Sequence, residues 1–233
     1  ESFAFENCLS LKSIEIPSSV TLIDDYCFYN CSSLKQISIP SSVTNIGQSA
    51  FNNCLSLKQI TFDFSSKITS IGSNTFAKCN SLIQINIPST IKNIGDHAFN
   101  DCCSLVQIKI PSSVTSIGTY CFSGCFSLAQ IYIPSSVTSI GEGAFAYCSS
   151  LKEISIPSSI NLFNERLFDS CKSLTQITIP SSVTSIGNYC FNECFSLVQI
   201  SIPSSVTSIG EGSFCLCTQL KMIQIPSSVN SIG

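Results

Sequence analysis

The prolines of this chain lie on a grid of 23 residues, and no other feature of the sequence restricts the fold as strongly. All nine prolines belong to the grid, and neighbours are 23 residues apart except Pro40 and Pro88, where two periods carry two extra residues. Columns of leucine, phenylalanine and cysteine follow the same period without a gap through ten units. A strict period of this size is the signature of stacked-repeat architectures, so we expect one continuous array.

Each unit reads Leu-x-x-Ile-x-Ile-Pro-Ser-Ser-Val-Thr-Ser-Ile-Gly-x-x-x-Phe-x-x-Cys-x-Ser, and residues 128–150 match it at every fixed position. The Ile-x-Ile alternation predicts a short strand with one buried face, and the proline ends that strand because it cannot donate to a ladder. The Val-x-x-Ile segment returns apolar side chains to the core, as a second short strand or as extended chain. Phe, Cys and the next Leu are three residues apart, which predicts turns or 3₁₀ segments on the back.

The glycine column of the unit predicts a turn with positive φ. Its two internal exceptions are Asp24 and Asn164, and Asn and Asp tolerate left-handed backbone better than other non-glycine residues. One unit cannot bury its seven apolar side chains alone, so it needs its copies above and below. We therefore predict a β-rich, right-handed solenoid with short parallel strands. Ten units at a strand spacing of ~4.8 Å would span about 48 Å.

The repeated motif resembles the BspA-type leucine-rich repeat, as in the segment from Leu128 through Pro134 to Cys148. The resemblance covers the whole chain and implies a single leucine-rich-repeat solenoid domain over residues 1–233. It also implies a surface or secreted protein, of the kind found in host-associated bacteria and anaerobic protists, that binds extracellular matrix or neighbouring-cell proteins. Because neither end carries a polar capping unit, we expect the chain to be a fragment of a longer array.

Charge and composition argue against several other functions. Charged residues are 11% of the chain, the net charge is −3, and no lysine or arginine cluster marks a nucleic-acid partner. Pro, Ser or Gly interrupts every apolar stretch before the roughly 18 residues that a spanning helix needs. The single His97 has no acid or nucleophile at a motif-like offset, and no Gly-x-Ser-x-Gly elbow occurs. We predict a non-enzymatic protein without a cofactor.

Fifteen cysteines are an odd number, so they cannot all pair within one chain. Ten form a column that we interpret as small, buried, apolar side chains. For the other five we favour free thiols, with disulfides in the close pairs as the alternative; they are Cys27, Cys103, Cys121, Cys190 and Cys215. A zinc site would need two converging pairs or nearby histidines, so we predict no metal site.

The outward positions of the main strand are the best candidate for recognition. Seven units place a glutamine just before the first isoleucine, and stacked glutamines can form a structural ladder or contact a partner. Mixed, variable columns on a regular sheet are where solenoids usually carry their partner contacts. The residues predicted to bind are Lys35, Gln36, Lys58, Gln59, Gln84, Gln107, Lys109, Gln130 and Tyr132.

Two roles for such a face remain open. The first is a cell-surface or secreted adhesion module whose ligand is an extracellular matrix or cell-surface protein. The second is a cytoplasmic scaffold that organises protein partners through the same repeat surface. Unpaired column thiols favour a reducing compartment, whereas the family resemblance favours the surface, and we prefer the surface. We interpret the two-residue insertion around Phe62–Lys67 as a tolerated bulge.

Overall fold

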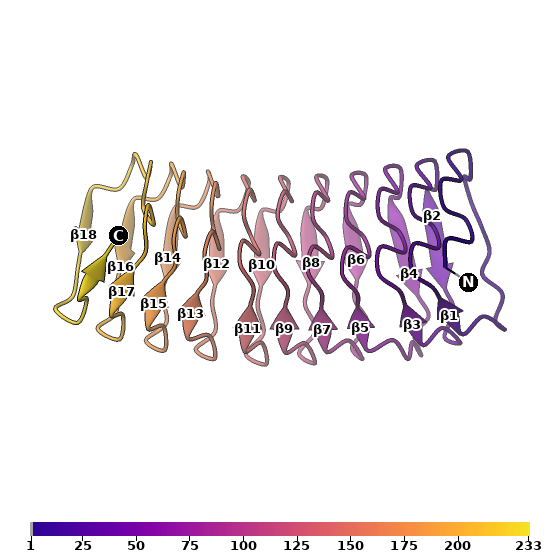
Figure 1. The fold of residues 1–233 in the computed structure, drawn as a ribbon, viewed down its shortest axis with the longest axis horizontal. Coiled ribbons are helices and arrows are strands. Elements are labelled where there is room, and N and C mark those ends of the chain that lie inside the picture. Colours follow the sequence, from indigo (N-terminus) through magenta and orange to yellow (C-terminus); the bar gives the residue numbers. More distant parts are fainter. Residues whose placement is uncertain (1) are drawn as a thin grey trace.

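The computed structural model describes residues 2–233, which form a solenoid of nineteen short β-strands. Successive units stack along one axis and contribute a main strand and a two-residue second strand (Figure 1). The described residues contain no helix, and the back of each unit is a series of turns. The predicted β-rich solenoid of short parallel strands is confirmed, and the Val-x-x-Ile segment ends in a second strand.

Nine of the ten units carry a main strand, and residues 13–16 of the first unit form none. The main strands are β2 (Gln36–Ile39), β4 (Gln59–Phe62), β6 (Gln84–Asn86), β8 (Gln107–Lys109), β10 (Gln130–Tyr132), β12 (Glu153–Ser155), β14 (Gln176–Thr178), β16 (Gln199–Ser201) and β18 (Met222–Gln224). The second strands are β1 (Leu22–Ile23), β3 (Asn45–Ile46), β5 (Ser70–Ile71), β7 (Asn93–Ile94), β9 (Ser116–Ile117), β11 (Ser139–Ile140), β13 (Leu162–Phe163), β15 (Ser185–Ile186), β17 (Ser208–Ile209) and β19 (Ser231–Ile232).

Parallel pairing keeps every column of the repeat in register. Gln36 pairs with Gln59 and Ile37 with Ile60, and the same columns pair wherever neighbouring strands join. The main strands form three sheets, β2–β4, β6–β12 and β14–β18, and the second strands form β1–β3, β5–β11 and β13–β19. The main strands lose their pairing between β4 and β6, and the second strands lose theirs between β3 and β5. Both breaks lie at the two-residue insertion, so the insertion interrupts the hydrogen-bonded ladders while the units continue to stack.

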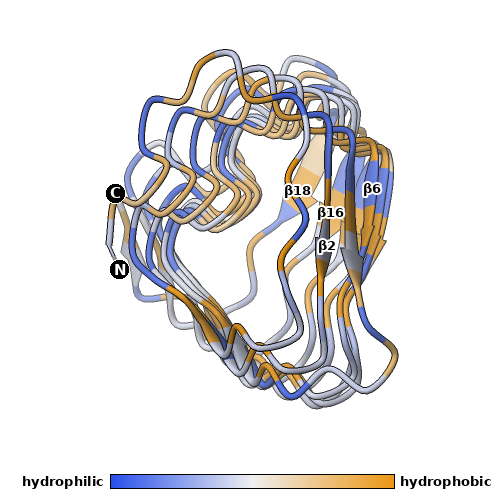
Figure 2. Ribbon diagram, turned by 90° about the vertical axis from the view of Figure 1, so that its right-hand side faces the viewer, coloured by the Kyte–Doolittle hydropathy of each residue, from blue (hydrophilic) through white to orange (hydrophobic). Residues whose placement is uncertain are grey.

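Copies of the same residue pack on one another in the core. The isoleucine, valine and leucine columns are buried through the inner units, and the phenylalanine rings stack face to face, for example Phe122 on Phe145 at 5.7 Å between ring centroids. Seen along the solenoid, the main strands form one wall and the chain winds around the apolar interior (Figure 2). This stacking gives each unit the burial that it cannot achieve alone.

The cysteine column has a second role besides filling space. The Cys125 thiol donates a hydrogen bond to the Phe99 carbonyl of the preceding unit at 3.3 Å, and nine column cysteines make the equivalent bond to the preceding unit. Burial raises the pKa of the Cys148 thiol to about 12, so it stays protonated and able to donate. The predicted burial of this column is confirmed from Cys31 to Cys194, whereas Cys8 and Cys217 at the two ends are half-buried.

The prediction that the glycine column needs positive φ is wrong. Among the glycines of residues 2–233, only Gly124, Gly143 and Gly212 have positive φ, and none of them belongs to that column. A Cβ on Gly118 would lie 2.5 Å from the Asp96 nitrogen and 2.5 Å from the Gly95 carbonyl carbon of the preceding unit. Glycine prevails in this column because neighbouring turns approach closely, not because of its dihedral angles, and Asp24 and Asn164 are its internal exceptions.

Positive φ occurs instead two and six residues after the glycine column, mostly at non-glycine residues. Tyr26 and Asn30 illustrate the pattern, with φ angles of 55° and 58°. Their N–H groups donate to the Gln48 and Asn52 carbonyls of the next unit at 2.9 and 2.8 Å. The left-handed residues thus point backbone donors along the solenoid axis, which is why the back is a hydrogen-bonded turn stack and not a helix.

Candidate protein-binding face

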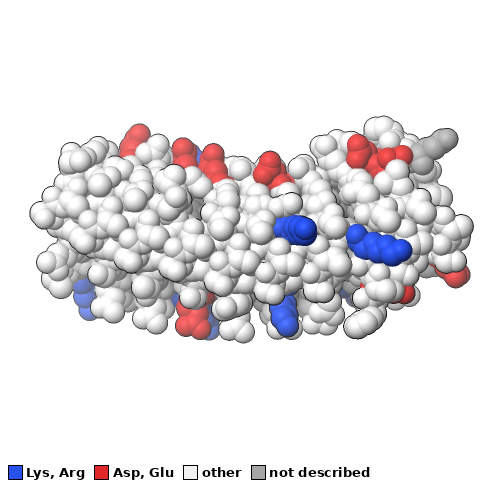
Figure 3. Space-filling model, turned by 90° about the horizontal axis from the view of Figure 1, so that it is seen from below, with Lys and Arg blue, Asp and Glu red and all other residues white. Residues whose placement is uncertain are grey.

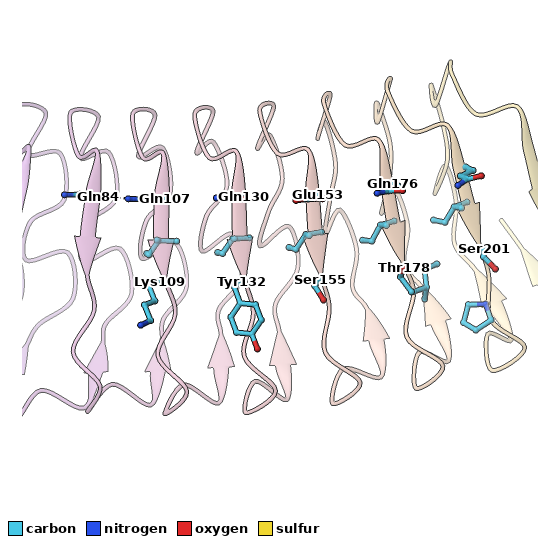
Figure 4. A pocket seen from close by; sticks show the side chains of 18 of the residues that line it. Gln84, Gln107, Lys109, Gln130, Tyr132, Glu153, Ser155, Gln176, Thr178 and Ser201 are labelled. Atoms are coloured by element: carbon cyan, nitrogen blue, oxygen red, sulfur yellow. Dashed lines mark hydrogen bonds between the residues drawn. The ribbon is translucent and has the colours of Figure 1, made fainter.

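A long groove runs along the outside of the main strands, with a volume of about 1300 Å³. It extends from β6 to β18, and its walls are the outward side chains of seven consecutive strands (Figure 4). A smaller groove of about 460 Å³ covers β2, β4 and the first unit. We call the outward side of the main strands the strand face.

Side-chain amides and hydroxyls line the larger groove together with isoleucines of the strands. Gln84, Gln107 and Gln130 alternate along the strands with buried isoleucines, as the predicted period of two requires. The Gln107 amide donates to the Gln84 carbonyl oxygen at 3.3 Å, so the predicted glutamine ladder forms at this one step. Within residues 2–233, no other hydrogen bond joins the side chains of two glutamines on the main strands, and Gln36 and Gln59 are not joined either. Most of these amides therefore remain available to a partner.

The predicted binding residues fall into three groups. Gln84, Gln107, Lys109, Gln130 and Tyr132 line the larger groove. Gln36 lines the smaller groove, which Phe62 and Asp63 of the insertion border. Lys35, Lys58 and Gln59 are exposed but line neither groove.

The groove also continues past the residues predicted for it. Glu153, Ser155, Gln176, Thr178 and Ser201 lie on it (Figure 4). It also reaches Met222 and Gln224 on β18. The same two outward columns that hold Gln130 and Tyr132 would have identified these positions. They were missed because the prediction stopped at the sixth unit.

The groove carries little net charge and two strongly exposed side chains. Among residues 2–233, Lys109 and Glu153 are the only charged residues that line it, so the groove is close to neutral. The Tyr132 side chain is 68% exposed on β10, near the middle of the groove. Met222, 78% exposed, stands at the carboxyl-terminal end. Exposed aromatic and methionine side chains are enriched at the centres of protein interfaces.

The insertion beside the smaller groove forms an ordered turn. The Asp63 carboxylate accepts hydrogen bonds from the Ser65 N–H at 2.9 Å and from its hydroxyl at 2.7 Å. These bonds lower the pKa of the Asp63 carboxyl. The turn presents Phe64 fully to solvent.

The His97 side chain packs against an aromatic ring of the next unit. It is half-buried, and its ring stacks on Tyr120 at 5.5 Å between centroids. Among residues 2–233, no group of three or more His, Cys, Asp or Glu side chains is placed to hold a metal ion. No helix long and apolar enough to cross a membrane occurs in the same range.

A parallel solenoid with an open groove of repeated outward side chains defines a leucine-rich-repeat binding scaffold. The chain belongs to the BspA-type leucine-rich repeat family, because the model of the BspA-type leucine-rich repeat region matches it in six copies over residues 1–129 and 115–233. Leucine-rich repeats are generally protein-interaction modules, and they are typically non-enzymatic.

Solved structures agree with this assignment. A leucine-rich repeat protein from Bacteroides ovatus is 31% identical, with a TM-score of 0.74, over 100% of this chain and 71% of that one. The T. pallidum leucine-rich repeat protein is 30% identical, with a TM-score of 0.57, over 79% of this chain and 77% of that one. The pneumococcal vaccine antigen PcpA shares the fold at 22% identity and a TM-score of 0.57, over 91% and 66% of the two chains. A comparison with curated proteins gave no match.

Proposed function

We propose that the protein is an adhesion module that binds an extracellular matrix or neighbouring-cell protein through the larger groove. The observation that carries the proposal is a groove of about 1300 Å³ with an exposed Tyr132 near its middle. Glutamine amides line it, and among the described residues only Gln84 and Gln107 of these are joined by a hydrogen bond between their side chains. Amides and hydroxyls at a spacing of one strand suit the alternating donors and acceptors of an extended polypeptide. The near-neutral lining favours hydrogen bonding over attraction to a highly charged ligand.

The groove is tested by replacing Gln107, Gln130 and Tyr132 together with alanine. Binding is measured by surface plasmon resonance against purified collagen, laminin and fibronectin. Removing an aromatic anchor and two amides should weaken binding to whichever protein is recognised by about 10- to 100-fold, since central interface residues commonly contribute about 2 kcal/mol or more.

The matched control is Tyr147→Asn, which removes a tyrosine that is 43% exposed and lies in the turns on the back of the solenoid. Tyr147 has φ 60°, and asparagine tolerates that conformation, so the control should fold and bind normally. Unchanged binding by the triple variant, or an equal loss in the control, would move the binding site off the strand face.

We also propose that the protein works at the cell surface or after secretion. The family resemblance and the extended groove support this location. Intact cells treated with a membrane-impermeant amine reagent should yield labelled protein, because lysines such as Lys35, Lys58 and Lys109 are exposed. Labelling that occurs only after lysis would favour the cytoplasmic scaffold instead.

A further inference from the structure

The charged side chains divide between two opposite sides of the solenoid. The strand side, from the leucine column to the second strand, carries eight cations and three carboxylates, a formal charge of +5. The turn side, from the glycine column to the residue before the leucine column, carries three cations and ten described carboxylates, a formal charge of −7. Figure 3 shows most carboxylates along one long edge of the molecule and the lysines elsewhere.

Hydrogen bonds hold four carboxylates of the turn side in fixed positions. We call the group Asp25, Asp96, Glu142 and Glu211 the acidic ridge; all four occupy the column after the glycine. Asp25 and Asp96 accept hydrogen bonds from backbone N–H groups of the next unit at 2.7 and 2.8 Å.

The two glutamates of the ridge are held by tyrosines. Glu142 and Glu211 accept hydrogen bonds from the Tyr120 and Tyr189 hydroxyls, both at 2.7 Å. Each carboxylate of the ridge therefore has a defined direction and retains acceptor capacity for another cation.

The lysines of the strand side have no such partners. We call the group Lys35, Lys109, Lys152 and Lys221 the basic face; all four are exposed. Within residues 2–233, none of the four is joined to a carboxylate by an ion pair. Because like charges repeat along the same side, an anionic surface of matching period would relieve their repulsion.

The acidic ridge has that matching period, since both groups repeat at the same strand spacing of ~4.8 Å. A second copy laid parallel to the first and displaced by one unit would bring four carboxylates into the same layers as four lysines. Lys35, Lys152 and Lys221 directly follow the leucine column, and Lys109 lies three residues further along its strand. The pairs are Asp25 with Lys35, Asp96 with Lys109, Glu142 with Lys152, and Glu211 with Lys221.

We propose that the protein associates side by side with a second copy of itself, the acidic ridge of one copy lying on the basic face of the next. The inference rests on the proposed function only in using the strand face as the contact surface. A contact about 48 Å long and about 13 Å wide, the length of a four-residue strand, covers about 600 Å² per copy. That area lies at the lower end of specific interfaces, so the association is weak and salt-sensitive. Because the two surfaces differ, the contact is heterologous and adds copies in an open row.

Sedimentation equilibrium on the whole chain tests the association. At about 100 μM protein in about 20 mM salt, the average mass should rise with concentration above 25.1 kDa. In about 500 mM salt, the protein should sediment as a monomer, because the Debye length falls to a few ångströms. A monomer under both conditions would overturn the proposal.

Two charge-removing variants then test the contact surfaces. The first converts Lys35, Lys109, Lys152 and Lys221 to glutamine. The second is Asp25→Asn, Asp96→Asn, Glu142→Gln and Glu211→Gln, which keeps the hydrogen-bond acceptors. Asparagine serves at this position in the chain itself, where Asn188 accepts from the Glu211 N–H at 2.9 Å. Each variant alone should be monomeric in low salt, with a thermal unfolding midpoint close to that of the parent.

Mixing the two variants gives the decisive result. The first retains an acidic ridge and the second retains a basic face, so the mixture should form a dimer of one copy of each and grow no further. A matched control, Lys78→Gln with Lys172→Gln, removes two turn-side cations and should associate at least as strongly as the parent. Self-association of either variant alone, or a mixture without dimers, would contradict the proposed geometry. A parent protein that stays monomeric in low salt but binds a matrix protein through the larger groove would remove this inference and leave the proposed function intact.

Discussion

At the scale of single residues, the cysteine column shows why a thiol occupies a position where an alanine or valine would also be apolar. The Cys125 side chain is fully buried, and its S–H group bonds the Phe99 carbonyl of the preceding unit. That carbonyl lies at a turn where regular strand pairing does not reach. A thiol is small and apolar enough for the core and can still donate, which serine could do only with a larger desolvation penalty.

Replacing this thiol should therefore cost more than its volume alone. Cys125→Ala removes one buried sulfur and leaves the Phe99 carbonyl with the Cys102 N–H, at 3.1 Å, but without its S–H donor. We therefore expect the free energy of unfolding to fall by about 1–3 kcal/mol. Urea denaturation followed by circular dichroism measures the change. Cys215→Ala is the control, because Cys215 is exposed and should change stability by less than about 0.5 kcal/mol. Equal effects at the two positions would contradict a structural role for the bond.

At the scale of the element, the turn after the second strand marks the limit of what the sequence could predict. The apolar columns, the strands and the stacked arrangement followed from the period alone. The reason for the glycine column did not, because it depends on how closely the turns of adjacent units approach. Asn164 shows that a side chain can be accommodated there: its amide donates to the Ile140 carbonyl of the preceding unit.

The candidate site was predictable to a similar extent. The alternation of the main strand correctly placed Gln107 and Tyr132 on the outer side, where both line the larger groove. The prediction that this face binds a partner remains a prediction. The separation of Lys35 and Lys58 from both grooves could not be foreseen, because it depends on where the surface is hollowed and not on which residues face outward.

Two glycines of the same column provide a test of the close approach. Gly118→Ala would place a methyl group 2.5 Å from backbone atoms of the preceding unit, so we expect a loss of about 1–3 kcal/mol in the free energy of unfolding. Gly72 lies at the insertion, where the nearest atom to an added Cβ is the Thr75 hydroxyl oxygen at 3.3 Å. Gly72→Ala should therefore change stability by less than about 1 kcal/mol in either direction. Chemical denaturation of both variants gives their free energies of unfolding. A Gly72 variant as unstable as the Gly118 variant would refute the steric explanation.

At the scale of the whole molecule, contacts between neighbouring units explain a similarity between units that are three apart. Tyr120 bonds Glu142, and its ring lies where a side chain on Gly143 would be. Tyr189 has the same relation to Glu211 and Gly212, 69 residues later. At these two steps a tyrosine in one unit goes with Glu-Gly in the next, so this part of the array repeats as pairs of matched neighbours as well as single units.

Removing one complete block should therefore shorten the array without breaking it. Deletion of residues 120–188 places Tyr189 directly after Thr119, where it takes the position of Tyr120 and keeps its own Glu211–Gly212 contact. We expect a folded protein with a urea m-value about 0.7 times that of the parent, because m scales with the surface exposed on unfolding. Deletion of residues 120–187 leaves one extra residue in the same turn, which displaces the cross-unit backbone bonds and should cost about 2 kcal/mol or more relative to the 69-residue deletion. Denaturant unfolding of the two proteins compares them directly. Equal stability would show that the array tolerates a slip of register, whereas the predicted difference would show that matched neighbours hold it together.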